Sequence, residues 1–365
     1  MSGAILLTGG TGFLGMETLA QLIARDEDDV IVLVRAQDDA DAARRLQGVL
    51  GRLYDEVPPA ATRVRAVRGD LLAPSLGLAP ADRRALIGEV DRIVHCAASI
   101  TFDLDLAQAR EINVGGVERV LELAREIDAD GELRRLAHVS TAYVSGRHEG
   151  RFGEGDLDLE QGFRNTYEQS KHEAERLLAR VEDLPLLIAR PSIVVGHRRS
   201  GWTPVFNVLY WPIRAFERGL FEEVPARADS IVDFVPVDYV IEGLLALLDD
   251  PDATGTYNLV AGDGALSAGE LAALHASLSG REPVRFVAQT GALPDSAETF
   301  VPYFDVRCNF DDTRARALLG RAGVSKPEAA GYLHRLIDYA HATHWGKRPL
   351  SRQAAELACE QPTRR

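Results

Sequence analysis

The sequence predicts an α/β fold in which a doubly wound parallel sheet is covered by helices on both faces. In the first half of the 365-residue chain, short apolar runs alternate with amphipathic helical patterns, as they do in successive βαβ units. The runs are apolar on both faces, which is typical of strands in the interior of a parallel sheet. A glycine-rich turn directly follows the first run, at a place where such sheets bind ligands.

The individual elements follow from these patterns. We expect parallel strands over residues 4–7, 30–34, 64–67, 92–95, 136–139 and 186–190. We expect helices over residues 13–24, 38–54, 104–127 and 165–181. After residue 191 the alternation stops, and the run 257–260 is expected to return to the sheet. The sequence therefore predicts a nucleotide-binding core and a smaller, mostly C-terminal substrate-binding part. The core comprises 1–190 and 232–262, and the second part comprises 191–231 and 263–365.

Composition and charge exclude several classes of protein. The net charge of −14 argues against non-specific binding to nucleic acid or to an anionic membrane, since a phosphate backbone requires a basic surface. Cys96, Cys308 and Cys359 are too few and too scattered for a disulfide scaffold or a zinc site, so we expect free thiols and no metal. No signal peptide precedes the first strand, and no apolar run reaches the roughly 20 residues of a membrane span. We therefore expect a cytoplasmic protein.

The glycine turn predicts a dinucleotide site. Gly9, Gly10, Gly12 and Gly15 lie between the first strand and the helix that follows it, in the spacing of a dinucleotide-binding fingerprint. The glycines permit a tight turn and a close approach of the backbone to a pyrophosphate, and the N-terminus of the helix contributes free N–H groups. This arrangement is typical of a Rossmann fold that binds a nicotinamide cofactor.

Arg35 favours NADPH as that cofactor. It directly follows the second strand, where a carboxylate would bind the ribose 2′-hydroxyl of NADH and a guanidinium suits the 2′-phosphate of NADPH. Arg44 and Arg45 follow on the next helix as further candidates for this phosphate. Asp70, after the third strand, is placed to accept a hydrogen bond from the adenine amino group, with a simple turn or cap role as the alternative.

Tyr167 and Lys171 predict a reaction centre. They are four residues apart on an expected helix, so their side chains lie on one face, where an ammonium group can lower the pKa of the tyrosine. Thr141 supplies a hydroxyl just after the fifth strand, at the carboxyl end of the sheet, with Ser140 as the alternative. Asn113 is expected either to link Lys171 to water through its backbone or to have a structural role.

These motifs occur together in one order. The chain contains the glycine turn, His95-Cys96-Ala97-Ala98, Asn113-Val114-x-Gly116, Ser140-Thr141, Tyr167-x-x-x-Lys171 and Arg190-Pro191-Ser192. Over residues 3–262 it resembles the extended short-chain dehydrogenase/reductase superfamily. Within that superfamily, three segments resemble the fatty acyl-CoA reductases: Phe102-Asp103-x-x-Leu106, His138 to Val144, and Asn165-Thr166-Tyr167. Two other segments resemble thioester reductase domains: Leu33-Val34-Arg35-Ala36 and Val235-Pro236-Val237-Asp238-Tyr239-Val240.

The resemblance implies roles for individual residues. Thr141, Tyr167 and Lys171 would be catalytic, with Asn113 in support. NADPH would contact Gly9, Thr11, Gly12, Phe13, Leu14, Gly15, Arg35, Arg45, Asp70, Leu71, Ala97, Lys171, Pro191 and Ser192.

The resemblance also implies a reaction. An NADPH-dependent enzyme of this branch reduces an acyl thioester on coenzyme A, or on an acyl or peptidyl carrier protein, to an aldehyde. Whether a second NADPH then reduces the aldehyde to the alcohol is left open by the sequence. The chain lacks the adenylation and carrier domains that usually precede a thioester reductase domain, and it is short for the C-terminal domain of eukaryotic fatty acyl reductases. We therefore expect the acyl carrier to come from outside the chain. The sequence leaves the acyl group, its carrier and the oligomeric state open.

The substrate-binding part offers clues to the acyl group and its carrier. Candidates to line an acyl channel, with ordinary core packing as the alternative, are Trp202, Phe206, Tyr210 and Trp211. Candidates to meet the phosphates of coenzyme A or phosphopantetheine, with a solvated loop as the alternative, are His197, Arg198 and Arg199.

The sequence also predicts the local structure of two further segments. The apolar stretch from Val205 to Phe216 is interrupted by Pro212 and Arg214, and we interpret it as a pocket wall or an amphipathic helix. The last dozen residues are expected to form a frayed tail.

Other functions remain alternatives. The main one is an extended reductase or dehydrogenase that acts on a ketone or alcohol, such as a sterol or polyketide carbonyl. A sugar-nucleotide epimerase or dehydratase is disfavoured by Arg35 and by Ala142 and Tyr143, which stand where sugar dehydratases of this fold place an acid pair. A non-catalytic protein that senses NADPH is disfavoured by the complete set of catalytic side chains.

Overall fold

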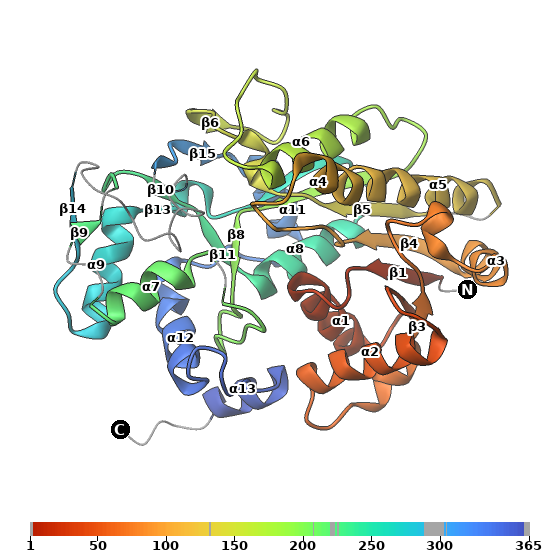
Figure 1. Cartoon of the computed structure of the whole chain (residues 1–365), viewed down its shortest axis with the longest axis horizontal. Coiled ribbons are helices and arrows are strands. Elements are labelled where there is room, and N and C mark those ends of the chain that lie inside the picture. Colours follow the sequence, from red (N-terminus) through yellow and green to blue (C-terminus); the bar gives the residue numbers. More distant parts are fainter. Residues whose placement is uncertain are drawn as a thin grey trace.

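A seven-stranded parallel sheet forms the centre of the structure (Figure 1). The computed structural model describes residues 3–130, 133–206, 208–219, 223–224, 226–287, 303 and 305–360. In spatial order the strands are β12 (Gly255–Leu259), β7 (Leu186–Pro191), β5 (Arg135–Val139), β4 (Val90–His95), β1 (Ala4–Thr8), β2 (Val30–Val34) and β3 (Val64–Arg68). The order reverses next to β1, as in a doubly wound sheet. The predicted fold class is confirmed, and so is the return of residues 257–260 to the sheet.

Helices cover both faces of this sheet, because alternate residues of each strand point to opposite sides. Ile5 and Leu7 of β1 pack in one core cluster with α1 (Phe13–Arg25), α2 (Asp39–Leu53) and α8 (Val237–Asp249). Ala4 and Leu6 pack in a second cluster, on the opposite face. The helices of that face are α3 (Pro80–Glu89), α5 (Gly115–Asp130) and α6 (Thr166–Leu178). Figure 1 shows α5 and α6 above the sheet and α1 and α2 below it.

The single helix predicted over residues 104–127 is wrong in one respect, because the structure has two helices there. α4 (Leu106–Asn113) ends at Val114, and α5 begins at Gly115. Two consecutive glycines have low helix propensity at this point, and the Asn113 side chain is held by groups outside the helix. The sequence reading also missed α3, which buries only Leu86 and therefore gives a weak periodic signal.

The remaining elements form the smaller part beside the sheet. Its helices are α7 (Tyr210–Glu217), α9 (Ala268–Ser279), α11 (Thr313–Arg321), α12 (Ala329–Ala342) and α13 (Arg352–Glu360). Its parallel pairs are β8 (Ile193–Val195) with β11 (Phe234–Pro236), β6 (Gly150–Phe152) with β15 (Cys308–Phe310), and β9 (Glu223–Val224) with β14 (Arg285–Phe286). An antiparallel pair joins β10 (Ile231–Val232) to β13 (Leu266–Ser267). Short 3₁₀ turns span Pro59–Arg63, Pro74–Gly77, Ala142–Ser145 and Gly262–Gly264.

The helix α11 returns from the smaller part to the edge of the sheet. The buried carboxylate of Glu154 accepts hydrogen bonds from the amides of Arg314 and Ala315, at the first turn of α11, at 2.6 and 2.9 Å. The same carboxylate accepts a bond from the amide of Asn258 in β12 at 3.1 Å. A negative charge at a helix N-terminus is favourable, so Glu154 fastens α11 to the edge strand.

The prediction of a frayed tail is wrong for residues 354–360, which belong to α13. Ala355 is buried in the core cluster that contains α1 and α2. Arg352 forms an ion pair with the fully buried Glu17 of α1, with 2.7 Å between nitrogen and oxygen. This partner on α1 gives the segment a fixed position that its local sequence does not reveal. Residues 361–365 lie outside the described part of the chain.

A buried ion pair between Arg190 and Glu175 generates a prediction about stability. The two side chains are 2 % and 1 % exposed and lie 2.6 Å apart. Replacing Arg190 by Met leaves a buried carboxylate without its partner, so we expect the free energy of unfolding to fall by about 3–5 kcal/mol. Urea unfolding followed by far-UV circular dichroism measures this.

The matched control for this variant is Arg125→Met, which breaks an exposed ion pair with Asp183 on the surface. Exposed pairs contribute little, so this variant should unfold close to the wild-type midpoint. Equal losses of stability in the two variants would contradict the prediction that the buried pair contributes more to stability than the exposed pair.

Candidate active site

The glycine turn has the close backbone contacts that a dinucleotide site requires. Gly9 has a φ of +75°, and a Cβ there would lie 2.6 Å from the amide nitrogen of Ala97. A Cβ on Gly15 would lie 2.1 Å from the Gly9 carbonyl oxygen. Gly12 is the N-cap of α1 and offers no side-chain cap, so the first amides of the helix are left for a ligand. These residues fit a pyrophosphate.

Arg35 lies at the expected adenosine end of this site, where its side chain is exposed beyond β2. The register of β2 and β3 pairs Val34 with Arg68, which brings a second arginine to the same sheet end. Arg68 donates a hydrogen bond to the carbonyl of Gln37 at 3.1 Å. The sequence reading missed Arg68, although its position at the end of the third strand was a usable signal.

Arg44 and Arg45 are less available than their sequence positions indicate. Both pair with Asp41 on the same helix, Arg44 at 3.2 Å and Arg45 at 3.1 Å. A phosphate would have to compete with this carboxylate, and Arg35 has no such partner within the described residues. Arg35 is therefore the stronger of the predicted phosphate contacts.

The remaining predicted cofactor residues lie around the same turn. Asp70 accepts a hydrogen bond from the amide of Leu72 at 3.0 Å, so one of its carboxyl oxygens closes a local turn. Leu71 lies against Gly116 at the start of α5, and Thr11 is exposed. The amide of Ala97 donates to the hydroxyl of Thr8 at 3.3 Å.

The predicted catalytic residues Thr141, Tyr167 and Lys171 meet in one pocket at the carboxyl ends of β4, β5 and β7. We call it the reaction-centre pocket. Its lining includes Gly9, Gly12, Phe13, Leu14, Gly15, Ser140, Thr141, Tyr167, Lys171, Pro191 and Ser192. Tyr167 forms a hydrogen bond with Thr141, which identifies Thr141 rather than Ser140 as its partner. The Thr141 hydroxyl also accepts from the amide of Tyr143 at 3.2 Å and donates to the carbonyl of Pro191 at 3.4 Å.

Lys171 is buried, and two groups of β5 hold its ammonium. It donates to the carbonyl of Val139 at 2.9 Å, and its nitrogen lies 3.2 Å from Nε2 of His138. Burial lowers the pKa of Lys171 to about 8. Burial, with the positive charge of Lys171, also holds the pKa of His138 well below its usual value, so the imidazole is neutral and accepts the bond. An ammonium has three N–H donors, so one is left for a ribose hydroxyl.

Two histidines beside Lys171, His95 and His138, were not among the predicted site residues. The register of β4 and β5 places His95 beside His138, and their ring centroids are 5.2 Å apart. His95 in turn forms a hydrogen bond with Thr8 at 2.6 Å. A histidine at the end of each of two adjacent strands was the available signal.

The structure contradicts the expectation that Lys171 lowers the pKa of Tyr167. Burial raises the pKa of Tyr167 to about 12, and the hydrogen bond with Thr141 offsets only part of that rise. Lys171 directs its ammonium at Val139 and His138 instead. The phenol therefore keeps its proton, which suits a group that donates a proton or a hydrogen bond to a carbonyl oxygen.

The side chain of Asn113 is buried and engaged in hydrogen bonds through both its oxygen and its nitrogen. It is 2 % exposed; its oxygen accepts from the amide of Ser99 at 2.8 Å, and its nitrogen donates to the carbonyl of Ser99 and to the hydroxyl of Ser170. The side chain thus joins the loop after β4 to α6. This geometry favours the structural role among the two alternatives.

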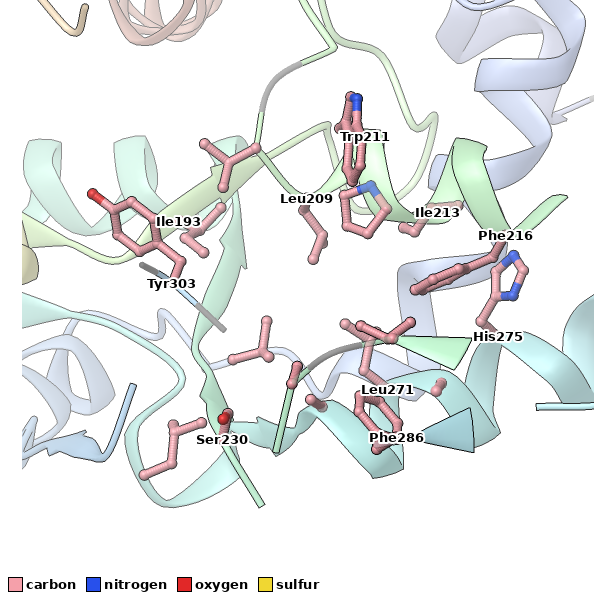
Figure 2. A pocket seen from close by; sticks show the side chains of 18 of the residues that line it. Ile193, Leu209, Trp211, Ile213, Phe216, Ser230, Leu271, His275, Phe286 and Tyr303 are labelled. Atoms are coloured by element: carbon pink, nitrogen blue, oxygen red, sulfur yellow. The ribbon is translucent and has the colours of Figure 1, made fainter. Parts of the chain in front are cut away.

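A second, almost entirely apolar space adjoins the reaction-centre pocket (Figure 2). This apolar pocket has an empty volume of about 1030 Å³, including its open mouth. Its walls come from α7, α9 and the short strands of the smaller part, with Leu209, Trp211, Ile213, Leu271 and Phe286 among them. Residues 205–216 were predicted as a pocket wall or an amphipathic helix, and α7 and the turn before it serve as both.

Of the four aromatic residues proposed for an acyl channel, only Trp211 lines the apolar pocket. Trp202 is 1 % exposed and packs against Phe13, with 6.2 Å between the ring centroids. Tyr210 is buried and accepts a hydrogen bond from the amide of Gly196 at 2.9 Å. Phe206 packs among other aromatic rings. For these three the alternative of core packing holds.

The basic loop at residues 197–199 is mostly committed to internal contacts. His197 is buried, and Arg198 pairs with Asp238 at 2.6 Å and with Glu242. Only Arg199 is exposed, and none of the three residues lines the reaction-centre pocket. The loop is thus neither a phosphate site of that pocket nor a freely solvated segment.

Comparison with known proteins identifies the family. The model of the male sterility proteins, an NAD-binding family, matches residues 7–244. The chain belongs to this family. Its resemblance to extended short-chain dehydrogenases/reductases is thereby confirmed, and so is the expectation of a nicotinamide cofactor.

Relatives of this male sterility family member fall in two groups. The chain is 29 % identical to the fatty acyl-CoA reductase wat of Drosophila melanogaster over 277 residues, which cover 66 % of this chain and 53 % of the relative. It is 32 % identical to a linear gramicidin synthase of Brevibacillus parabrevis, over 67 % of this chain and 5 % of the synthase polypeptide. The chain thus spans about half the length of the fatty acyl-CoA reductases that it matches.

A solved structure supports the same assignment. The terminal R domain of the myxalamid PKS-NRPS pathway superposes with a TM-score of 0.81 at 26 % identity, over 96 % of this chain and 93 % of that one. Among the described residues of our family member, no helix is long and apolar enough to cross a membrane. The same residues contain no cluster of three metal-binding side chains.

The lowered pKa of Lys171 generates a prediction about cofactor affinity. The ammonium loses its proton as the pH rises through about 8, and a neutral amine attracts the dinucleotide less strongly. We expect the Kd of NADPH to rise between pH 7 and pH 10, as measured by quenching of tryptophan fluorescence. Lys171→Met should bind more weakly at pH 7 and lose this pH dependence. A parallel pH dependence in both proteins would refute the assignment to Lys171.

Proposed function

We propose that this chain is an NADPH-dependent reductase that converts an acyl thioester to an aldehyde. The observation that carries the proposal is the junction of two spaces, since the pocket containing Thr141, Tyr167 and Lys171 opens into an apolar pocket suited to an acyl chain. The names of the relatives, fatty acyl-CoA reductases among them, support a thioester substrate.

The residues of the reaction centre divide the chemistry between them. The cofactor supplies a hydride to the carbonyl carbon of the thioester when it is bound. Tyr167 donates a hydrogen bond to the carbonyl oxygen, where negative charge develops, and gives that oxygen a proton. Thr141 donates a second hydrogen bond to this oxygen once its hydroxyl turns away from the carbonyl of Pro191. Donors fixed in such a position each contribute roughly 10²–10³-fold to the rate in other acyl-transfer sites. Lys171 binds the ribose with its remaining N–H group and adds a positive charge.

The product follows from the collapse of the hemithioacetal. Its hydroxyl loses a proton as the carbonyl reforms, the carbon–sulfur bond breaks, and the thiolate leaves and takes up a proton. The balance is one acyl thioester, one NADPH and one proton converted to aldehyde, free thiol and NADP⁺. The apolar walls exclude water from the acyl group, which strengthens the hydrogen bonds at the oxygen. A second NADPH would reduce the aldehyde to the alcohol at the same residues.

Coenzyme A and the phosphopantetheine of a carrier protein present the same thioester, and both are proposed as donors of the acyl group. The cytoplasmic location expected from the sequence is part of the same proposal.

The thiol product separates this function from its alternatives. Octanoyl-CoA with NADPH should release free thiol, detected with a disulfide reagent, together with an aldehyde or alcohol product. Reduction of a ketone or oxidation of an alcohol releases no thiol. Tyr167→Phe should lower kcat by about 10²–10⁴-fold while NADPH affinity stays near that of the wild type. Oxidation of NADPH by ketones alone, with no thioester turned over, would overturn the proposal.

The choice of NADPH rests on Arg35. Hydrogen bonds to charged groups contribute about 1.5–3 kcal/mol, so Arg35→Ser should weaken NADPH binding roughly ten- to hundredfold and leave NADH binding nearly unchanged. Arg45→Ser is the matched control, since Asp41 already engages Arg45 and its loss should matter less. Equal affinities of the wild type for NADPH and NADH would contradict the assignment.

A further inference from the structure

The apolar pocket and the reaction-centre pocket meet at a neck of four side chains. The residues that line both spaces are Tyr143, Ile193, Val208 and Tyr303. Figure 2 shows Tyr303 beside Ile193 at one end of the apolar pocket, while Phe216 and His275 lie at the other end. An acyl chain that places its carbonyl at Thr141 and its tail in the apolar pocket has to pass this neck.

Packing fixes the ring of Tyr303 on the side of the neck. It stacks on Phe102 with 5.5 Å between ring centroids and meets Tyr143 edge-on at 5.4 Å. Phe102 in turn lies 5.7 Å from the ring of Tyr167. Tyr303 is therefore separated from the catalytic tyrosine by a single aromatic ring, and its own ring has little freedom to turn aside.

The hydroxyl of Tyr303 is anchored as well. It accepts a hydrogen bond from the side chain of Asn165 at 2.9 Å. Asn165 is the N-cap of α6, where its oxygen accepts from the amide of Glu168 at 2.9 Å. Burial and the nearby Glu168 carboxylate raise the pKa of Tyr303, so its hydroxyl stays protonated. The neck is thereby joined to the first turn of the helix that carries Tyr167 and Lys171.

From this arrangement we infer that Tyr303 is a specificity-determining residue, which admits unbranched acyl chains and rejects groups that are branched or cyclic next to the carbonyl. The inference rests on the proposed thioester reduction. A methylene chain is narrow enough to lie beside a fixed aromatic ring. A branch at the carbon next to the carbonyl would meet that ring, and well-packed protein interiors accommodate extra carbon atoms poorly.

Two thioesters with the same number of carbons provide the test. Octanoyl-CoA and 2-ethylhexanoyl-CoA differ in shape and not in apolar content, so the ratio of their kcat/KM values reports the neck alone. We expect the wild type to prefer the straight chain by at least tenfold. Tyr303→Ala should reduce that preference at least tenfold, mainly through faster turnover of the branched substrate. Tyr303→Phe keeps the ring and should keep the wild-type ratio.

Two further variants distinguish the neck from the rest of the pocket and from general damage. Phe216→Ala enlarges the far end, so it should change the preference between octanoyl and longer straight chains and leave the ratio for branching unchanged. NADPH affinity, measured by fluorescence, shows that each variant is folded. Should Tyr303→Ala fail to bind NADPH, Tyr303→Leu takes its place with the same expected direction.

The outcomes separate this inference from the proposed function. If the wild type turns over no thioester, the proposed reaction is wrong. If it turns over octanoyl-CoA but the variants without the ring keep the wild-type preference, the role of Tyr303 is wrong. A loss of preference in Tyr303→Phe as large as in Tyr303→Ala would assign the effect to the hydroxyl and the α6 cap rather than to the ring, and would also overturn it.

Discussion

The reaction centre depends on the buried ion pair between Glu175 and Arg190. Glu175 lies one helical turn after Lys171, and Arg190 directly precedes Pro191, whose carbonyl accepts the hydrogen bond of Thr141. The pair therefore fixes α6 against β7 at the level where Lys171 and Thr141 have to meet. Both side chains are nearly inaccessible to water, so each charge would be strongly destabilising if its partner were removed. This constraint makes the relative position of helix and strand rigid.

Burial then sets the chemistry of the residues that this anchor positions. The same removal of water raises the pKa of Tyr167 to about 12 and lowers the pKa of Lys171 to about 8, because it disfavours the charged form of each. The tyrosine keeps its proton for a carbonyl oxygen. The Glu175 carboxylate favours the charged form of the lysine, and the contacts with Val139 and His138 hold its ammonium in place. Two opposite shifts thus suit the proposed direction of reaction, the reduction of a carbonyl.

The smaller part of the molecule completes the site with residues that lie far along the chain from Tyr167 and Lys171. α7 and α9 wall the apolar pocket, and Tyr303 reaches back to the cap of α6 through Asn165. Other contacts also run from the second half of the chain to the core, since Glu154 fastens α11 to the sheet edge and Arg352 fastens α13 to α1. The apolar pocket is consequently attached to α6, the helix that carries Tyr167 and Lys171, through direct contacts.

The sheet, the glycine turn and the candidate catalytic side chains could be predicted from the sequence alone. These are local patterns, since periodicity places the strands, glycines mark the turn, and a four-residue spacing places Tyr167 and Lys171 on one helical face. Only the tertiary structure decided which groups surround them. It turned Lys171 toward His138, buried Trp202 and Tyr210 in the core, and brought Tyr303 to the neck. The reason is physical: burial and long-range contacts depend on residues far apart in the chain, so no local pattern encodes them.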